Sequence, residues 1–166
     1  MSVRSEAHHE IVVRQARHPD LDAVGDFFLG LSHRSRYHRF LSGIRYLSPE
    51  QKRHLVTVSA RQVVLLALDG PTVVGHIMAV FEDDVTVDVG LVVADAYQRR
   101  GVGTRMVDEL VTTLAASGVR DACLHVQAQN HVVMVWAQRL LTNLRFERSR
   151  ESLTVRGRFL PRLRGG

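Results

Sequence analysis

A short glycine-containing stretch, residues 98–104, constrains the fold of this chain most, because it joins two patterns of different period. Before it, residues 85–94 are rich in valine and alternate as a buried strand does. After it, apolar residues recur at helical spacing from Val102 onwards, which predicts that a helix begins there. Glycine lets a backbone approach a ligand closely, and the free N–H groups of a first helical turn attract anions. With Arg99 and Arg100 alongside, the stretch predicts a pyrophosphate site.

Three kinds of phosphate-binding loop place glycines between a strand and a helix. A P-loop requires Gly-Lys-Ser or Gly-Lys-Thr at its end, whereas Gly103 is followed by Thr104 and Arg105. A dinucleotide-binding fingerprint requires a third glycine where this chain has Met106. The third kind contains Gln or Arg, then two residues, then Gly-x-Gly or Gly-x-Ala, and residues 98–103 fit it. An ordinary glycine-rich turn remains the alternative at this point.

The segments before this loop predict an antiparallel sheet. Asp69-Gly70-Pro71 and Glu82-Asp83-Asp84 are short turns between apolar strands, and turns this short join antiparallel neighbours. This pattern argues against a doubly wound dinucleotide fold. The expected strands are 11–13, 62–68, 72–81, 85–94, 122–128 and one in 146–155, and the expected helices are 20–31, one capped by Ser48, 102–117 and one from Asn130 to Leu144.

Composition narrows the function further. A chain of 166 residues with 45% hydrophobic content predicts one domain. No apolar run approaches the roughly 20 residues that span a bilayer, and no secretory signal opens the chain, so we expect a cytoplasmic protein without membrane contact. The net charge of +5 comes from 22 basic residues, of which Lys52 is the single lysine. A basic surface suits an anionic cofactor, and without a nucleic-acid motif we expect no nucleic-acid partner.

Metal binding is not expected from the sequence. Cys123 is the single cysteine, which excludes an intramolecular disulfide and argues against a cysteine-based metal site. His8 and His9 could supply half of a metal site, but neighbouring histidines in a polar segment are usually only solvated. The chain contains neither repeats nor a linker. We therefore expect a flexible arm at 1–10, a single domain at 11–156 and a basic mobile tail at 157–166.

The order of these elements and the pattern in residues 98–104 resemble the GNAT superfamily of N-acetyltransferases, and within it most closely the bacterial protein-lysine acetyltransferase (Pat-like) domains. The resemblance covers residues 11–156. It implies an α/β (α+β) fold with a mixed central sheet, an antiparallel N-terminal meander and about four flanking helices. Residues 35–40 also resemble the segment between the first two helices of those enzymes. This basic, partly aromatic segment could line a pocket or a subunit contact, or form a solvated helix face.

The resemblance also implies acetyl-CoA as the co-substrate. In the family, the strand before the loop carries a bulge whose backbone groups pair with the pantetheine and polarise the thioester. Asn130, at the start of the next helix, would lie near the pantetheine or its sulfur, and it can also simply cap that helix. The cofactor-binding residues that the resemblance implies are Leu91, Val92 and Val93 on the strand, Gln98, Arg99, Arg100, Gly101, Val102, Gly103 and Thr104 in the loop, and Asn130.

The implied reaction is direct attack of an amine on the thioester, for which a general base must remove a proton from the amine. Ten residues before Gln98, where similar protein-lysine acetyltransferases have glutamate, this chain has Asp88. Strand alternation puts Asp88 on one face with Thr86, Gly90 and Val92. A charged residue in such a strand is costly unless it is exposed or used, so we interpret Asp88 as the catalytic base.

Two departures from the family pattern limit what the resemblance implies. The tyrosine that often protonates the departing thiolate has no counterpart, because its place falls on Ala137 or Leu141. Arg145-Phe146 stands where the family usually has Gly-Phe. The expected function is acetyl or short-acyl transfer from acyl-CoA to a primary amine, either a protein lysine or a small molecule. A catalytically degenerate acyl-CoA-binding regulatory module is the alternative, and a homodimer is left open.

Overall fold

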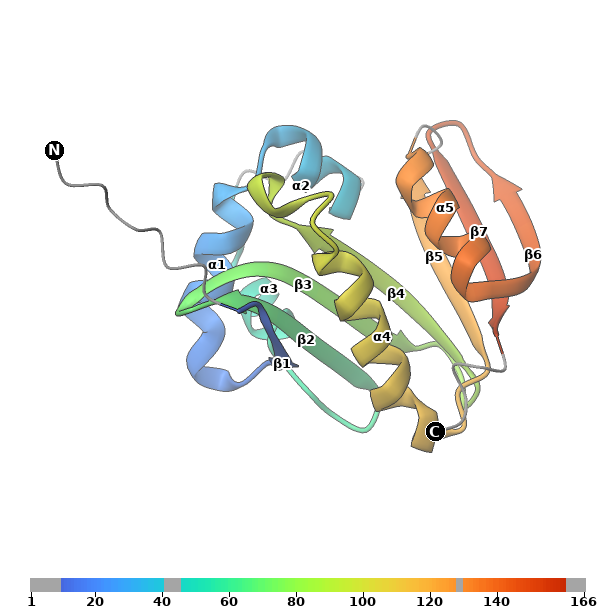
Figure 1. Ribbon diagram of the computed structural model, residues 1–166, viewed down its shortest axis with the longest axis horizontal. Coiled ribbons are helices and arrows are strands. Elements are labelled where there is room, and N and C mark those ends of the chain that lie inside the picture. Colours follow the sequence, from blue (N-terminus) through green and yellow to red (C-terminus); the bar gives the residue numbers. More distant parts are fainter. Residues whose placement is uncertain (1–9, 41–45, 128–129, 161–166) are drawn as a thin grey trace, which may run out of the picture.

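The computed structural model describes residues 10–40, 46–127 and 130–160. Its strands are β1 (Val12–Gln15), β2 (Gln62–Asp69), β3 (Thr72–Phe81), β4 (Thr86–Val93), β5 (Asp121–Gln127), β6 (Leu141–Arg148) and β7 (Ser152–Phe159). Its α-helices are α1 (Leu21–Gly30), α2 (His33–Phe40), α3 (Pro49–His54), α4 (Val102–Leu114) and α5 (His131–Leu140). Three short 3₁₀ helices are η1 (His18–Asp20), η2 (Asp95–Tyr97) and η3 (Ala115–Ser117). The strands form one sheet in the order β1-β2-β3-β4-β5-β7-β6 (Figure 1).

The sheet is mixed, as predicted. Strands β1 to β4 form an antiparallel meander, and β7 pairs antiparallel with both β5 and β6. The pairing of β4 with β5 is parallel and covers only Thr86–Asp88 against Asp121–Cys123. Beyond these residues the two strands separate, and Figure 1 shows them diverging from their meeting point. The sheet therefore opens between β4 and β5.

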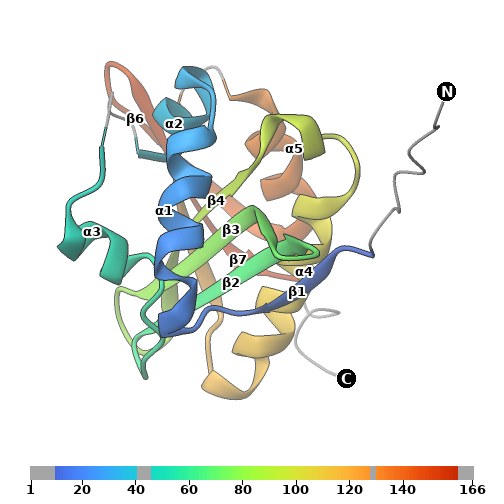
Figure 2. The same ribbon diagram turned by 90° about the vertical axis from the view of Figure 1, so that its left-hand side faces the viewer.

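Both faces of the sheet are covered by helices (Figure 2). Strand β2 is apolar at consecutive positions, and its side chains alternate between two clusters. Leu65 and Ala67 pack in the cluster that contains the apolar side of α4, whereas Val64 and Leu66 pack with α1 and the region around α3. The helical spacing of apolar residues in α4 therefore produces one of the two cores directly.

The C-terminal third differs from the prediction. Helix α5 ends at Leu140, not at Leu144, and two strands follow it where one was expected. Buried Leu153, Val155 and Phe159 alternate along β7 with less buried residues, two of them arginines. Because those arginines interrupt the apolar pattern, the sequence did not predict the full strand. Strand β7 extends beyond the expected end at Val155, and residues 157–159 of the expected tail belong to it. The structure also has five α-helices in its described residues, against about four expected.

The register of β4 is a further correction. From Val87 to Val93 it pairs with β3 without a shift, so the bulge that the resemblance implied is absent from this pairing. The separation from β5, rather than a bulge, leaves backbone groups of β4 outside the β4–β5 ladder. No helix in the described ranges is long and apolar enough to cross a membrane.

Candidate active site

A cavity of about 430 Å³ lies in the opening between β4 and β5. It extends from the loop before α4 to the apolar side of α5, and β5 contributes Leu124, His125 and Val126 to its wall. Arg100 and Asp88 do not line it. The predicted cofactor-binding residues that do line it are Leu91, Val92, Val93, Gln98, Arg99, Gly101, Val102, Gly103, Thr104 and Asn130.

The loop at the mouth of the cavity has the backbone of an anion-binding turn. Arg99 has φ +60° and Gly101 has φ +79°, and Gly101 is the residue that immediately precedes α4. Left-handed residues alternating with others point successive N–H groups to the same side, and such concave turns bind phosphate groups. The N-terminus of α4 adds its free N–H groups and a partial positive charge at the same place.

Side-chain contacts fix this loop to the elements around it. Gln98 Nε2 donates hydrogen bonds to the Val93 carbonyl oxygen, at 3.0 Å, and to Ser35 Oγ, at 3.3 Å. The Tyr97 hydroxyl donates to Asp69 Oδ2 at 2.6 Å. The Arg100 guanidinium lies 5.0 Å from the centre of the Tyr97 ring, where a cation–π contact forms. Gln98 and Arg100 thus have contacts that stabilise the loop itself.

Asp95, just before the loop, holds the N-terminus of α2 beside it. Its carboxylate accepts hydrogen bonds from the Ser32 backbone N–H at 3.1 Å and from the hydroxyls of Ser32 and Ser35 at 2.8 and 2.9 Å. Partial burial alone would raise the pKa of Asp95, but these hydrogen bonds outweigh it and keep the pKa below its ordinary value. Ser35 and its neighbour Arg34 both line the cavity.

The segment 35–40, for which a pocket-lining role was one expectation, therefore begins at the cavity wall. It lies within α2, and Ser35 is buried against the loop. The side chains of residues 37–40 lie outside the described part of the structure.

Gly103 lines the cavity and also has a packing role that the sequence did not predict. A Cβ at this position would overlap the indole ring of Trp136 on α5, and both residues line the cavity. The absence of a side chain at Gly103 therefore lets α5 pack closely against the start of α4. Sequence reasoning missed this contact because it joins residues far apart in the chain.

Asp88 lies on the sheet face predicted for it. Its neighbour Val87 is fully buried in the cluster beneath α4, so Asp88 points to the opposite face. The Asp88 side chain is 42% exposed, and its Oδ1 lies 3.9 Å from His125 Nε2. His125 lines the cavity, so its imidazole ring lies between Asp88 and the cavity. Sequence reasoning did not single out His125, although strand alternation puts it on the same face of β5 as Cys123.

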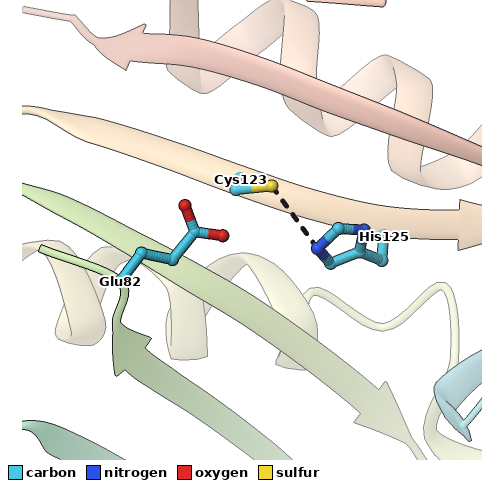
Figure 3. A group of neighbouring side chains, drawn as sticks. All are labelled: Glu82, Cys123 and His125. Carbon is cyan, nitrogen blue, oxygen red and sulfur yellow. Dashed lines mark hydrogen bonds between the residues drawn. The ribbon is translucent and has the colours of Figure 1, made fainter. Parts of the chain in front are cut away.

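Further polar groups surround His125 (Figure 3). Its Nε2 lies 3.5 Å from Cys123 Sγ, and its Nδ1 lies 3.2 Å from Thr154 Oγ1. Glu82, from the turn after β3, also faces Cys123, and Arg156 donates a hydrogen bond to Glu82 Oε2 at 2.9 Å. Burial raises the pKa of the Cys123 thiol to about 12. This thiol is therefore protonated at neutral pH and is a poor nucleophile.

Solved structures with the same fold are numerous, and three represent them. The GNAT domain of the PAT protein of S. lividans is 20% identical, with a TM-score of 0.77 over 89% of each chain. The PaiA N-acetyltransferase from Thermoplasma acidophilum, in complex with coenzyme A, is 16% identical, with a TM-score of 0.71 over 90% of this chain and 99% of its own. A putative acetyltransferase from Salmonella typhimurium, YncA, with acetyl-CoA, is 14% identical, with a TM-score of 0.67 over 90% and 92%.

The fold predicted from the sequence is confirmed by these structures. No curated protein matches the chain in sequence. The profile of the acetyltransferase (GNAT) family, however, matches residues 31–140, which include the loop, β4, β5 and α5. The chain therefore belongs to the acetyltransferase (GNAT) family.

Proposed function

We propose that this acetyltransferase moves an acetyl group from acetyl-CoA directly to a primary amine. The observation that carries the proposal is the cavity between β4 and β5, which extends from an anion-binding loop to His125, and Asp88 lies beside that histidine. Two structures with this fold contain coenzyme A or acetyl-CoA, which supports the choice of co-substrate. Acyl transfer requires a site for the anionic thioester and a base near the thioester carbon, and this cavity has candidates for both.

The cofactor is proposed to bind with its pyrophosphate at residues 98–104 and its pantetheine in the opening of the sheet. Strand β4 pairs with β5 only as far as Asp88, so those backbone groups of Leu91, Val92 and Val93 that bond neither to β3 nor to Gln98 are proposed to bind the pantetheine amides. Arg99 and the N-terminus of α4 balance the phosphate charge. Asn130 accepts a hydrogen bond from Val133 N–H at 3.5 Å, so its capping role leaves its amide nitrogen for a ligand.

Asp88 is proposed as the general base, acting on the amine from the face opposite α4. Its carboxylate is partly exposed, which allows a water molecule to relay the proton. Cys123 is buried and protonated, which favours direct transfer over an acyl-cysteine intermediate. Ala137 and Leu141, the positions that correspond to the family tyrosine, line the cavity, and neither side chain can donate a proton. Water is therefore the proposed proton source for the departing thiolate.

The acceptor class remains open between a protein lysine and a small amine. A degenerate acyl-CoA-binding module is the second candidate, because the tyrosine is absent and the base is a carboxylate one methylene shorter than the family glutamate. A homodimer also stays a prediction, which light scattering would test. Release of free thiol from acetyl-CoA in the presence of a panel of amines and lysine peptides separates an enzyme from a binding module.

The decisive variant is Asp88→Asn, compared with Asp108→Asn as a control. Asp108 is an exposed residue of α4, so its substitution changes the net charge equally without touching the cavity. Loss of a general base should lower kcat by about 10² to 10⁴-fold. Affinity for acetyl-CoA should stay near the wild-type value because Asp88 does not line the cavity. Asp88→Glu should keep substantial activity.

Three outcomes contradict parts of this proposal. A kcat near the wild-type value in Asp88→Asn would remove Asp88 as the base and direct attention to Glu82, Asp83 and Asp84. A raised KM for the amine with unchanged kcat would make Asp88 an acceptor-binding residue. Tight acetyl-CoA binding without thiol release from any amine would favour the binding module.

A further inference from the structure

Four side chains beside the cavity carry atoms that metals bind. Glu82, Cys123 and His125 each contribute one potential ligand atom, and these atoms all lie within 4.8 Å of one another (Figure 3). Asp88 adds an oxygen 3.9 Å from His125 Nε2. We call these four residues the β5 cluster. Its residues come from the turn after β3, from β4 and from β5, so no spacing in the sequence predicts it.

Two distances within the β5 cluster, from His125 Nε2 to Cys123 Sγ and to Asp88 Oδ1, are close to those of a tetrahedral zinc site. Zn–S bonds of about 2.3 Å and Zn–N bonds of about 2.0–2.1 Å, at tetrahedral angles, place sulfur and nitrogen roughly 3.6 Å apart. Cys123 Sγ and His125 Nε2 are 3.5 Å apart. Nitrogen and oxygen ligands would be about 3.4 Å apart. The Asp88–His125 separation of 3.9 Å therefore needs only a small side-chain rotation.

Outer contacts already orient two of the ligands. Metal-binding histidines usually hold their second ring nitrogen in a hydrogen bond, and ligating carboxylates are hydrogen-bonded in turn. His125 Nδ1 lies 3.2 Å from Thr154 Oγ1, which leaves Nε2 directed at Cys123 and Asp88. Arg156 holds Glu82 through Oε2, so the other carboxylate oxygen can bind a metal while that ion pair persists.

We propose that the β5 cluster binds a zinc-type divalent cation, and that the bound cation inhibits acetyl transfer. Thiolate, imidazole and carboxylate are the ligand types of zinc sites. Glu82, Cys123 and His125 supply all three types, and Asp88, beside His125, is the fourth proposed ligand. The partly exposed side chains of His125 and Asp88 give the ion a path from solvent. Binding displaces the thiol proton of Cys123 into the solvent.

The inhibition, but not the binding, rests on the proposed function. A cation bound to Asp88 would occupy the carboxylate that is proposed to accept the proton from the amine. The metal site also departs from the expectation of no metal, which followed from the single cysteine. That expectation considered only ligands that are close in sequence or are additional cysteines.

Cobalt titration of the full, chelator-treated chain tests the binding. Co²⁺ should produce a thiolate-to-cobalt charge-transfer absorption together with the strong visible bands of tetrahedral cobalt, and Zn²⁺ should displace it. Cys123→Ser should abolish the thiolate absorption, and His125→Gln or Glu82→Gln should weaken cobalt binding at least tenfold. His18→Gln, on the exposed η1, and the double substitution His8→Gln with His9→Gln should bind like the wild type. Circular dichroism confirms that each variant is folded.

Cobalt binding without the thiolate absorption, or an unchanged absorption in folded Cys123→Ser, would overturn the site. Loss of binding in the His8/His9 variant alone would place the metal outside the β5 cluster and also overturn it. For inhibition, Zn²⁺ should lower thiol release by the wild type, and it should lower that of Cys123→Ser much less, each relative to its own metal-free rate. Zn²⁺-insensitive transfer by a wild type that binds cobalt would refute the inhibition. Cobalt binding without any transfer would refute the proposed function instead.

Discussion

Two glycines at opposite ends of α4 offer a matched test of the loop. Gly101 precedes the helix with φ +79° and ψ 2°, and Gly118 follows it after η3 with φ +79° and ψ 4°. A Cβ at either position would meet no atom within 4 Å. Alanine at each position therefore changes mainly the backbone energy, which rises by about 1–2 kcal/mol in the left-handed region.

This energy should appear as lost stability in Gly118→Ala and as lost acetyl-CoA affinity in Gly101→Ala. Gly118 does not line the cavity, so Gly118→Ala should lower Tm by roughly 2–8 °C and leave acetyl-CoA affinity unchanged. Gly101 lies in an exposed loop that can relax when no ligand is bound, whereas bound pyrophosphate would require the left-handed conformation. Gly101→Ala should therefore keep most of its stability and bind acetyl-CoA about 5–30-fold more weakly, the same energy expressed as a ratio.

Thermal unfolding without ligand and calorimetric titration with acetyl-CoA measure the two quantities separately. The expected result is a crossed pattern, in which one variant loses stability and the other loses affinity. Equal losses of Tm in Gly101→Ala and Gly118→Ala, with wild-type affinity in both, would refute the reasoning. The loop would then keep its conformation for structural reasons, independently of any phosphate.

The remaining predictions concern packing, pH and self-modification. Gly103→Ala should destabilise the fold by about 1–3 kcal/mol in chemical denaturation because its Cβ would overlap Trp136, and adding Trp136→Phe should restore part of the loss. Hydrogen bonds from Arg14 lower the pKa of Asp20 in the folded state. Their contribution to stability is therefore present above about pH 4 and is lost as the pH falls through the folded-state pKa. Asp20→Asn removes this contribution, so Tm should fall less steeply below about pH 4 in the variant than in the wild type. Any self-acylation on a lysine should map by mass spectrometry to Lys52, which does not line the cavity, and loss of all transfer in Lys52→Arg would contradict this.

Local patterns predicted the central part of the fold well. The bounds of β3 agree with the predicted strand at both ends, because the turns on either side consist of residues that disfavour strands. The capping prediction at Ser48 also holds, since Ser48 Oγ accepts from Gln51 N–H at 3.1 Å and Gln51 Oε1 accepts from Ser48 N–H at 2.8 Å. The predicted helix 102–117 ends where Gly118 takes the positive φ that is common after helix C-termini.

Features that depend on long-range contacts could not be predicted in this way. The apolar residues at helical spacing in α5 continue through Leu141 and Leu144, yet both residues belong to β6. Strand β6 pairs with β7 on either side of the register shift between Thr142 and Arg145, and this pairing outweighs the helical periodicity. The packing of Trp136 on Gly103 requires knowing that α4 and α5 are neighbours. The β5 cluster likewise depends on the register of three chain segments, which no local pattern encodes.

The short parallel pairing of β4 with β5 explains why the loop, the cavity and the β5 cluster occur together. Asp88 and Cys123 form the final pair before the strands separate, so the carboxylate lies where the opening begins. His125 follows two residues later on β5, on the same face, and already faces the cavity. One more pair, Val89 with Leu124, would extend the closed part of the sheet towards the residues of β4 that are proposed to bind the pantetheine. The position of the proposed base relative to the cavity is therefore set by backbone register and does not depend on side-chain packing alone.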